Sequence, residues 1–181
     1  VDENRIFVSG MSNGAMMAQT YATNVIGMAA TFHAFVRPMQ VRGSGSLVGI
    51  ASVAGIRGLP GHGAYCASKA AVISYCESLR VELARSGVRV LTICPGFVAT
   101  PLTRENRYAM PFLMQADAFA HQAFAAIAKG RSYSVIPWQM GWVAKLLRLL
   151  PNAVYDRVLA NRPRKHRHSQ RDPQSQPPDS P

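Results

Sequence analysis

The feature that most constrains the fold is an alternation of short, β-rich apolar segments with longer segments of helical periodicity. The expected strands are 47–51, 88–94 and 133–136, and the expected helices are 23–39, 64–86 and 116–129. Gly87 and Gly130 directly follow two of these helices, where glycine commonly ends a helix. Because strands that alternate with helices form parallel sheets covered by helices, the sequence predicts an α/β fold with a parallel sheet and flanking helices.

Three polar side chains near the middle of the chain form a candidate catalytic set. Tyr65 and Lys69 are spaced i,i+4 and share one face of the expected helix, and Ser52 follows the expected strand 47–51. A phenol has a pKa of about 10, and a nearby ammonium lowers it by favouring the phenolate. A serine hydroxyl can orient a reacting oxygen. The set therefore predicts proton transfer to or from a carbonyl oxygen, although the Tyr-Lys pair alone also fits a surface lysine above a half-buried tyrosine.

Two further motifs strengthen this interpretation. Asn24 lies at the start of the expected helix 23–39, and the segment 95–100 reads Pro-Gly-Phe-Val-Ala-Thr. Together with Ser52, Tyr65 and Lys69, these motifs resemble the short-chain dehydrogenase/reductase family over about residues 23–164. The resemblance implies a Rossmann-like parallel sheet.

The resemblance also implies an activity, namely NAD(P)-dependent interconversion of small-molecule carbonyls and secondary alcohols. Tyr65 would be the general acid/base, Ser52 would polarise the carbonyl, and Lys69 would bind the nicotinamide ribose and tune the tyrosine. Asn24 would hold a water of the proton relay. By the same resemblance, Pro95, Gly96 and Thr100 would contact the nicotinamide, with Thr100 reaching its carboxamide.

The segment before Asn24 is short for a complete dinucleotide-binding half. Only about two dozen residues precede this asparagine, so the early strands of the family have no counterpart and the predicted sheet is truncated. We expect impaired activity if cofactor binding depends on that half, and the choice between NAD and NADP stays open. An uncovered sheet edge exposes unpaired backbone groups, so we predict that residues 5–9 pair beside the strand 47–51.

Residues 1–22 support two different interpretations. They read as strand, tight turn and helix, and Gly10-x-Ser12-x-Gly14 fits a nucleophile elbow. The segment resembles the elbow of polyhydroxybutyrate depolymerases and related feruloyl esterases, which are α/β-hydrolases. Gly10 and Gly14 also fit the glycine-rich turn of the dehydrogenase family, but Met16 occupies the place of its last glycine. The sequence favours the elbow over the glycine-rich turn.

Two alternatives to oxidoreduction therefore remain. The first is an esterase that uses Ser12 as its nucleophile, although none of the downstream histidines lies in a segment that resembles the hydrolase histidine loop. The second is a non-catalytic recombined fragment, because two unrelated resemblances meet near residue 22.

Composition narrows the class of protein. The chain has 181 residues, 48% of them hydrophobic, which suffices for one domain, expected over 1–164. Its three cysteines lie in expected helices and strands, so we expect small core residues in a reducing, cytoplasmic compartment and no metal site. The formal net charge is +11, and part of the excess precedes a Pro/Ser/Gln-rich end. We expect 165–181 to be a disordered basic tail that does not bind nucleic acid.

Two surfaces are candidates for contact with partners. The helices at 24–37 and 64–85 correspond to those that form the dimer contact in the dehydrogenase family, so the resemblance implies a homodimer. The segment 137–150 combines tryptophans and leucines with Lys145 and Arg148 and is too short to span a bilayer. It is a candidate for peripheral membrane contact, with a pocket cap or subunit contact as alternatives.

Overall fold

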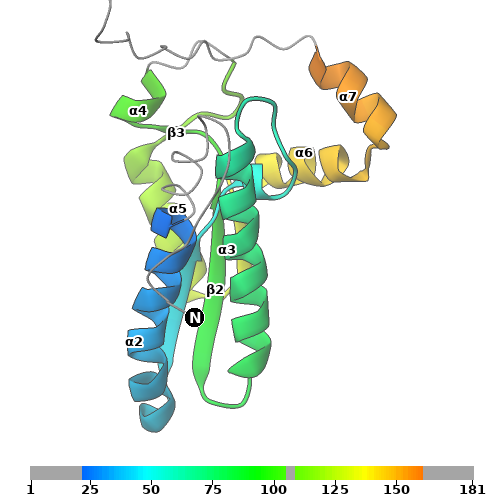
Figure 1. Cartoon of the computed structure of the whole chain (residues 1–181). Helices are drawn as coiled ribbons and strands as arrows, with labels where there is room; N and C mark the ends of the chain where they lie inside the picture. The colour runs from blue at the N-terminus through cyan, green and yellow to red at the C-terminus, as the bar shows by residue number, and fades with distance from the viewer. Residues whose placement is uncertain (1–21, 105–108, 161–181) are drawn as a thin grey trace, which may run out of the picture.

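The structure is a computed structural model that describes residues 22–104 and 109–160 of the chain (Figure 1). In chain order, its elements are a π-helical turn η1 (Ala22–Ile26), α2 (Gly27–Arg42), β1 (Gly45–Ile50), a 3-10 turn η2 (Val53–Gly55), α3 (Gly63–Glu82), β2 (Val88–Pro95), β3 (Val98–Ala99), α4 (Pro101–Arg104), β4 (Met114–Gln115), α5 (Ala116–Ala128), β5 (Tyr133–Ile136), α6 (Trp138–Leu149) and α7 (Asn152–Ala160).

The main sheet has three parallel strands in the order β1-β2-β5, which confirms the predicted α/β class. Leu47 pairs with Val90 across the first ladder, and Thr92 pairs with Tyr133 across the second. A small parallel pair, β3 with β4, lies apart from this sheet. The central strand β2 is buried at nearly every position, which is why it reads as an almost continuous apolar run.

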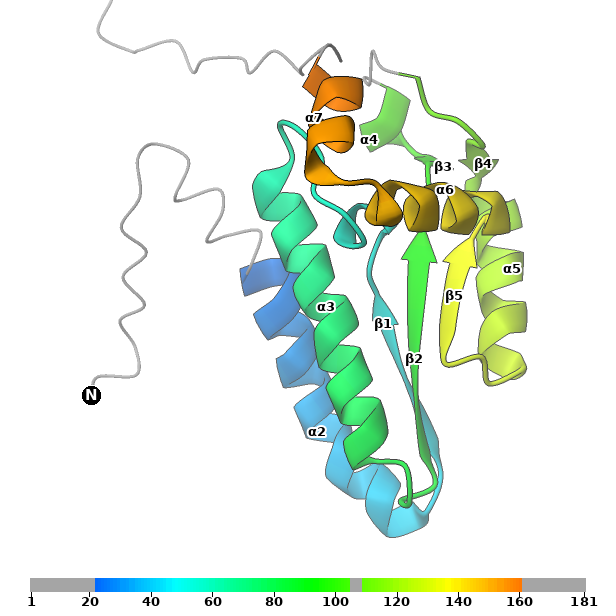
Figure 2. The same ribbon diagram turned by 90° about the vertical axis from the view of Figure 1, so that its right-hand side faces the viewer.

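Helices cover both faces of the sheet, as Figure 2 shows. The helices α2 and α3 lie on one face, α5 lies on the other, and α6 crosses above the ends of the strands toward which the arrows point. The larger core forms under α2 and α3 and includes Phe32, Leu47, Val72 and Leu79. A smaller cluster around Ile93 and Ile136 packs under α5. Two layers of helices therefore enclose the sheet, and the fold has three layers.

The expected strands and helices are present, with differences at their ends. The first helix begins with a π-helical turn instead of an α-helical one. The helix α3 ends at Glu82, before Gly87, which has φ +76° in the following turn. A Cβ at Gly87 would lie 2.0 Å from the carbonyl oxygen of Gly43, so this turn needs glycine for both its conformation and its close approach. The sequence did not predict α7.

The cysteines lie in the core, as expected from their positions in the sequence. Cys66, Cys76 and Cys94 are free thiols that are at most 5% exposed. Within the described residues, no group of three or more histidine, cysteine or acidic side chains is placed to hold a metal ion. None of the described helices combines the length and the apolar character that crossing a bilayer requires.

The strand β1 pairs with β2 and, within 22–104 and 109–160, with no other strand. The predicted neighbour at 5–9 lies outside the described residues, as does the tail at 165–181. Both therefore stay predictions. The single-domain boundary at 164 also falls outside the described part and stays a prediction.

Candidate active site

Ser52 is held at the carboxyl end of β1 by its own loop. It has extended backbone angles (φ −169°, ψ 157°) and caps the 3-10 turn η2, where its Oγ accepts a hydrogen bond from the N–H of Ala54 at 3.2 Å. The residue is 7% exposed. Because a serine hydroxyl both accepts and donates, the cap leaves the O–H of Ser52 available to donate to another oxygen.

Lys69 joins the helix α3 to the end of β1. Its Nζ donates to the backbone oxygen of Ile50 at 3.0 Å, two residues before Ser52. Burial lowers the pKa of Lys69 below that of an ordinary lysine, and the nearby Cys94 opposes this effect. The ammonium has two further N–H donors, so this contact does not exhaust its capacity.

Tyr65 lies one turn before Lys69 on α3 and is 40% exposed. The Nζ of Lys69 is 5.8 Å from the centre of its ring. The predicted i,i+4 pair therefore places an ammonium close to the aromatic ring on a surface that a small molecule can reach. That accessibility separates Tyr65 from a tyrosine that serves only to fill the core.

Asn24 is connected to α3, the helix of Tyr65 and Lys69, by two hydrogen bonds that meet at Ser68. Its Nδ2 donates to Ser68 Oγ at 3.0 Å, and Ser68 donates to the backbone oxygen of Tyr65 at 2.8 Å. Ser68 is fully buried. The sequence-based reasoning missed Ser68, and its one signal was a polar residue next to Lys69 on a helix face that turns into the core.

Asn24 belongs to the π-helical turn η1, where the sequence predicted ordinary helix. Such turns are rare and occur often at functional sites. The hydrophobic pattern of the sequence does not distinguish such a turn from an α-helical one.

A hollow of about 350 Å³ opens beside β1, between this strand and the helices η1 and α2. Its polar side chains include Asn24 and Lys69, and its apolar walls include Met28, Phe32 and Ile50. Tyr65 and Ser52 are not among the lining residues. The structure thus brings Asn24 and Lys69 to one hollow. Tyr65 is one helical turn from Lys69, and Ser52 is two residues after Ile50, so both lie close in the chain to residues that line the hollow.

The 95–100 segment lies at the end of β2. The N–H of Gly96 donates to the backbone oxygen of Ile136 at 2.7 Å, and a Cβ at Gly96 would lie 2.9 Å from the Met140 side chain. Thr100 donates its N–H to Thr103 Oγ1 at 2.8 Å, which closes the loop that follows Pro95. These residues are therefore fixed at the same end of the sheet as Ser52.

Glycine allows the serine loop to approach α3. A Cβ at Gly55 would lie 2.7 Å from the carbonyl carbon of Lys69 and 2.9 Å from the N of Ala70, and both are backbone atoms. Ser52 is three residues upstream of this contact. The packing of η2 against α3 thus sets how far Ser52 lies from the Tyr65 helix, a role that the sequence-based reasoning did not assign to Gly55.

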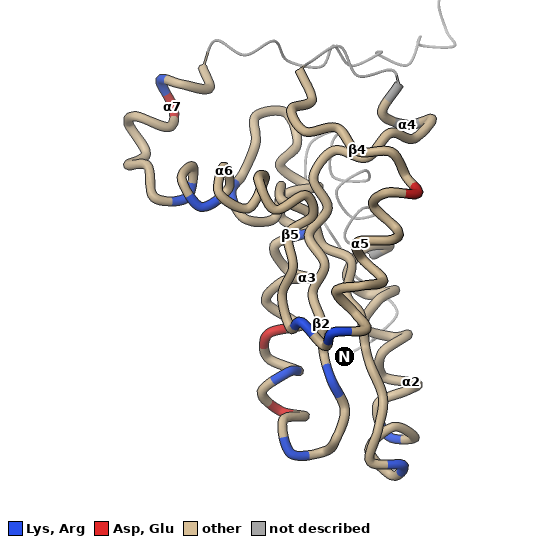
Figure 3. The backbone as a smooth tube through the Cα atoms, turned by 180° about the vertical axis from the view of Figure 1, so that it is seen from behind, with Lys and Arg blue, Asp and Glu red and all other residues tan. Residues whose placement is uncertain are grey.

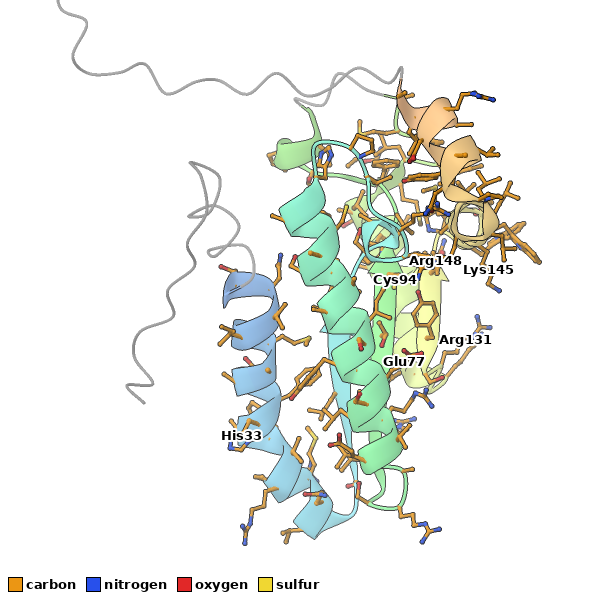
Figure 4. The ribbon with its side chains drawn as sticks, turned by 45° about the vertical axis from the view of Figure 1, so that its right-hand side comes forward. His33, Glu77, Cys94, Arg131, Lys145 and Arg148 are labelled. Atoms are coloured by element: carbon orange, nitrogen blue, oxygen red, sulfur yellow. The ribbon has the colours of Figure 1, made fainter. Side chains whose placement is uncertain are left out.

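Cys94 lies beneath the site on β2 (Figure 4). It is fully buried, its sulfur accepts from the backbone N–H of Ser52, and its thiol donates to Tyr133 Oη at 3.3 Å. Burial raises the pKa of the Cys94 thiol and also that of Tyr133. This contact fixes the backbone of Ser52 from below.

Arg57 connects the serine loop to the end of α6. Its Nη1 donates to the backbone oxygens of Leu147, Arg148 and Leu150, and its Nη2 donates to Asn152 Oδ1 at 3.0 Å. The guanidinium also lies 3.9 Å from the ring centre of Tyr155. This contact could not be predicted from the sequence, because its two sides are about 90 residues apart.

Comparison with known proteins identifies the family of the chain. The family model for short chain dehydrogenases matches residues 5–111. This chain belongs to the short-chain dehydrogenase family. The match begins at Arg5 and so includes Gly10, Ser12 and Gly14, the residues that also resemble a hydrolase elbow. These three lie outside the described residues, so their geometry is not part of the site.

Two curated relatives and one solved structure illustrate the likeness. An uncharacterized oxidoreductase of Myxococcus xanthus is 45% identical over 134 residues, which cover 74% of this chain and 53% of the relative. An uncharacterized oxidoreductase of Mycobacterium tuberculosis is 35% identical over 158 residues, covering 81% and 61%.

The solved structure is a short chain dehydrogenase from Burkholderia cenocepacia in complex with NADP. It superposes with a TM-score of 0.68 at 23% identity, covering 87% of this chain and 66% of that one. This likeness shows the fold. The chain thus spans between about half and two thirds of the length of these proteins.

Proposed function

We propose that this chain catalyses NAD(P)-dependent interconversion of a small-molecule carbonyl and a secondary alcohol, with Tyr65 as general acid/base. The observation that carries the proposal is the reach of Lys69 from α3 to the backbone oxygen of Ile50. This contact links the helix of Tyr65 to the strand that ends at Ser52. Family membership and the NADP complex of the Burkholderia dehydrogenase support the choice of cofactor.

In the direction of reduction, a nicotinamide held at this site would supply the hydride that the carbonyl carbon gains. The phenol of Tyr65 gives its proton to the carbonyl oxygen, so the product alcohol gains one hydride and one proton and the tyrosine is left as phenolate. The ammonium of Lys69, 5.8 Å from the ring centre, stabilises negative charge on that side chain. Ser52 donates its O–H as a hydrogen bond to the carbonyl oxygen, since the bond that its Oγ accepts from the N–H of Ala54 does not use this hydrogen.

The hollow beside β1 fits the nicotinamide ribose chemically. Lys69 supplies N–H donors for ribose hydroxyls, and Met28, Phe32 and Ile50 supply apolar walls. Asn24 uses its Nδ2 for Ser68, and we assign its amide oxygen to a water that returns the proton to Tyr65. By family resemblance, Pro95, Gly96 and Thr100 would face the nicotinamide, and Gly10 and Gly14 would face the phosphates.

We also propose a homodimer through helices 24–37 and 64–85. Large apolar side chains are exposed along these helices: Ile26 is 46%, Phe35 53% and Val81 67% exposed. Burying them against a second copy would remove apolar surface from water. Three buried free thiols support a reducing, cytoplasmic location.

Thermal unfolding with NADH and NADPH tests cofactor binding directly. A ligand that binds the folded chain raises its apparent stability by about 2.7 kcal/mol at a concentration 100 times its Kd. We expect stabilisation by one of the two cofactors and a loss of that effect in Lys69→Ala. Neither cofactor stabilising the chain would contradict the proposal.

Turnover of a panel of ketones and secondary alcohols then tests the role of Tyr65. We expect Tyr65→Phe to lose at least 10²-fold in kcat while keeping cofactor stabilisation, because general acid/base catalysis contributes about 10²- to 10⁴-fold. Tyr75→Phe, which removes the other phenol of α3, is the matched control. p-Nitrophenyl ester turnover that is lost in Ser12→Ala and kept in Tyr65→Phe would overturn the proposal in favour of a hydrolase.

A further inference from the structure

The helix α6 has two apolar faces, although packing on the protein requires only one. Its inner face includes Met140 and Ala144, each 6% exposed. Its outer face carries large apolar side chains that are 63–81% exposed, namely Trp138, Trp142, Leu146 and Leu149. In Figure 4 the side chains of α6 fan outward from the body of the molecule. The inner face explains why α6 packs here, and the outer face is left without a structural role.

The outer face is presented by a helix that is firmly held. Arg57 donates to three backbone oxygens at the carboxyl end of α6, and Met140 packs against Gly96 at the other end. The hydrogen bond from Tyr155 to the backbone oxygen of Gly58 fixes the following helix α7. The tryptophans therefore lie on a rigid, exposed ridge across the end of the sheet (Figure 2).

The charge of this ridge is of one sign. Lys145 and Arg148 lie on α6, the helix has no acidic residue, and in Figure 3 it is marked by Lys and Arg alone. Lys145 lies over the ring of Trp142, with its Nζ 5.4 Å from the ring centre. Tryptophan and leucine beside lysine and arginine are the composition of helices that lie in a membrane interface.

We propose that α6 docks on an anionic lipid surface, lying in the interface with Trp138, Trp142, Leu146 and Leu149 among the headgroups and acyl chains. Its 12 residues are too few to span a bilayer, so the docking is peripheral. A second copy fits the same face less well. A symmetric dimer through α6 would bring Lys145 and Arg148 of both copies together, which like charges oppose.

The tryptophans provide a direct measurement, because Trp138 and Trp142 are the two tryptophans of the whole chain. The full chain is mixed with vesicles of phosphatidylcholine alone or of phosphatidylcholine with 30% phosphatidylglycerol. We expect a blue shift of the tryptophan emission and co-sedimentation with the anionic vesicles, both reduced by added salt. Quenching by brominated lipid then reports whether the indoles reach the acyl region.

Two variants separate the apolar and the charged contributions. Leu149→Ser should weaken partition into anionic vesicles by about tenfold, because the leucine side chain is largely exposed to water on the protein and is removed from water only when it enters the lipid. Replacing Lys145 and Arg148 together by Gln should weaken it by about 25-fold, since each cation near an anionic surface contributes about fivefold. Phe124→Ser is the matched control, because Phe124 is 73% exposed on a different helix, α5, and its loss should leave partition unchanged.

Three results would overturn the proposal. The first is an emission spectrum that anionic vesicles leave unchanged, with the chain in the supernatant. The second is partition that falls equally in Leu149→Ser and Phe124→Ser, which would show nonspecific adsorption. The third is a blue shift that depends on protein concentration in the absence of lipid, which would assign the ridge to a second copy of the chain.

Discussion

The contact between Gly55 and α3 gives a sharp test of how the site is positioned. In Gly55→Ala the new methyl group would lie 2.7 Å from the carbonyl carbon and 2.8 Å from the oxygen of Lys69. Carbon atoms in proteins pack at about 3.5–4.0 Å, so the loop must retreat by roughly 1 Å. The opposing atoms are helix backbone, which cannot rotate away as a side chain would.

The expected cost follows from two opposing effects. Overpacking of this kind destabilises by about 1–3 kcal/mol. Replacing glycine by alanine also reduces the freedom of the unfolded chain, which stabilises by about 0.4–1 kcal/mol. We therefore expect Gly55→Ala to lower the free energy of unfolding by about 1–2 kcal/mol. If the proposed reaction holds, a retreat of Ser52 by about 1 Å should also reduce kcat by about 10²-fold.

The same loop supplies the control. A Cβ at Gly58 meets no atom within 4 Å, and its φ is not in the left-handed region. Gly58→Ala should be neutral or slightly stabilising. Urea unfolding followed by far-ultraviolet circular dichroism measures both variants. Equal stability of Gly55→Ala and Gly58→Ala would refute the argument that the loop and α3 are in tight backbone contact.

Three further outcomes are expected. Arg57→Ala should destabilise by about 2–4 kcal/mol in urea unfolding, because charge-assisted bonds to three backbone oxygens and the contact with Tyr155 are lost, and a loss no larger than that of Arg131→Ala would contradict this role. Burial raises the pKa of Tyr133, so this residue stabilises the fold fully below pH 10.0 and loses that contribution as the pH rises further. Tyr133→Phe should therefore show a shallower loss of stability above pH 10.0, and parallel alkaline unfolding curves would count against it. Phe35→Glu should shift the chain to a monomer in light scattering if α2 forms a dimer contact, whereas an unchanged mass would exclude Phe35 from that contact.

Much of the fold could be predicted because its signals are local. Strand and helix periodicity indicated the parallel sheet, and the buried pattern of β2 matches its apolar run. The candidate site was visible because Tyr65 and Lys69 occupy one helix face and Ser52 ends a strand. The structure also shows what that pattern left out: Asn24 contacts Ser68, and Cys94 supports the backbone of Ser52. The hydrolase interpretation of Ser12 gained no support from the family comparison.

By itself the sequence determined the fold class, the family and the side chains available for chemistry, since these depend on residue type and on spacing within one element. Tertiary structure alone decided how the elements meet. The contact of Arg57 with the end of α6 joins residues about 90 positions apart, and the fit of Gly55 against Lys69 depends on distances of less than 3 Å. The tertiary structure also decided which face of α6 is exposed to solvent. Periodicity marks a helical face as apolar, but only the packed neighbours determine whether that face meets protein or solvent.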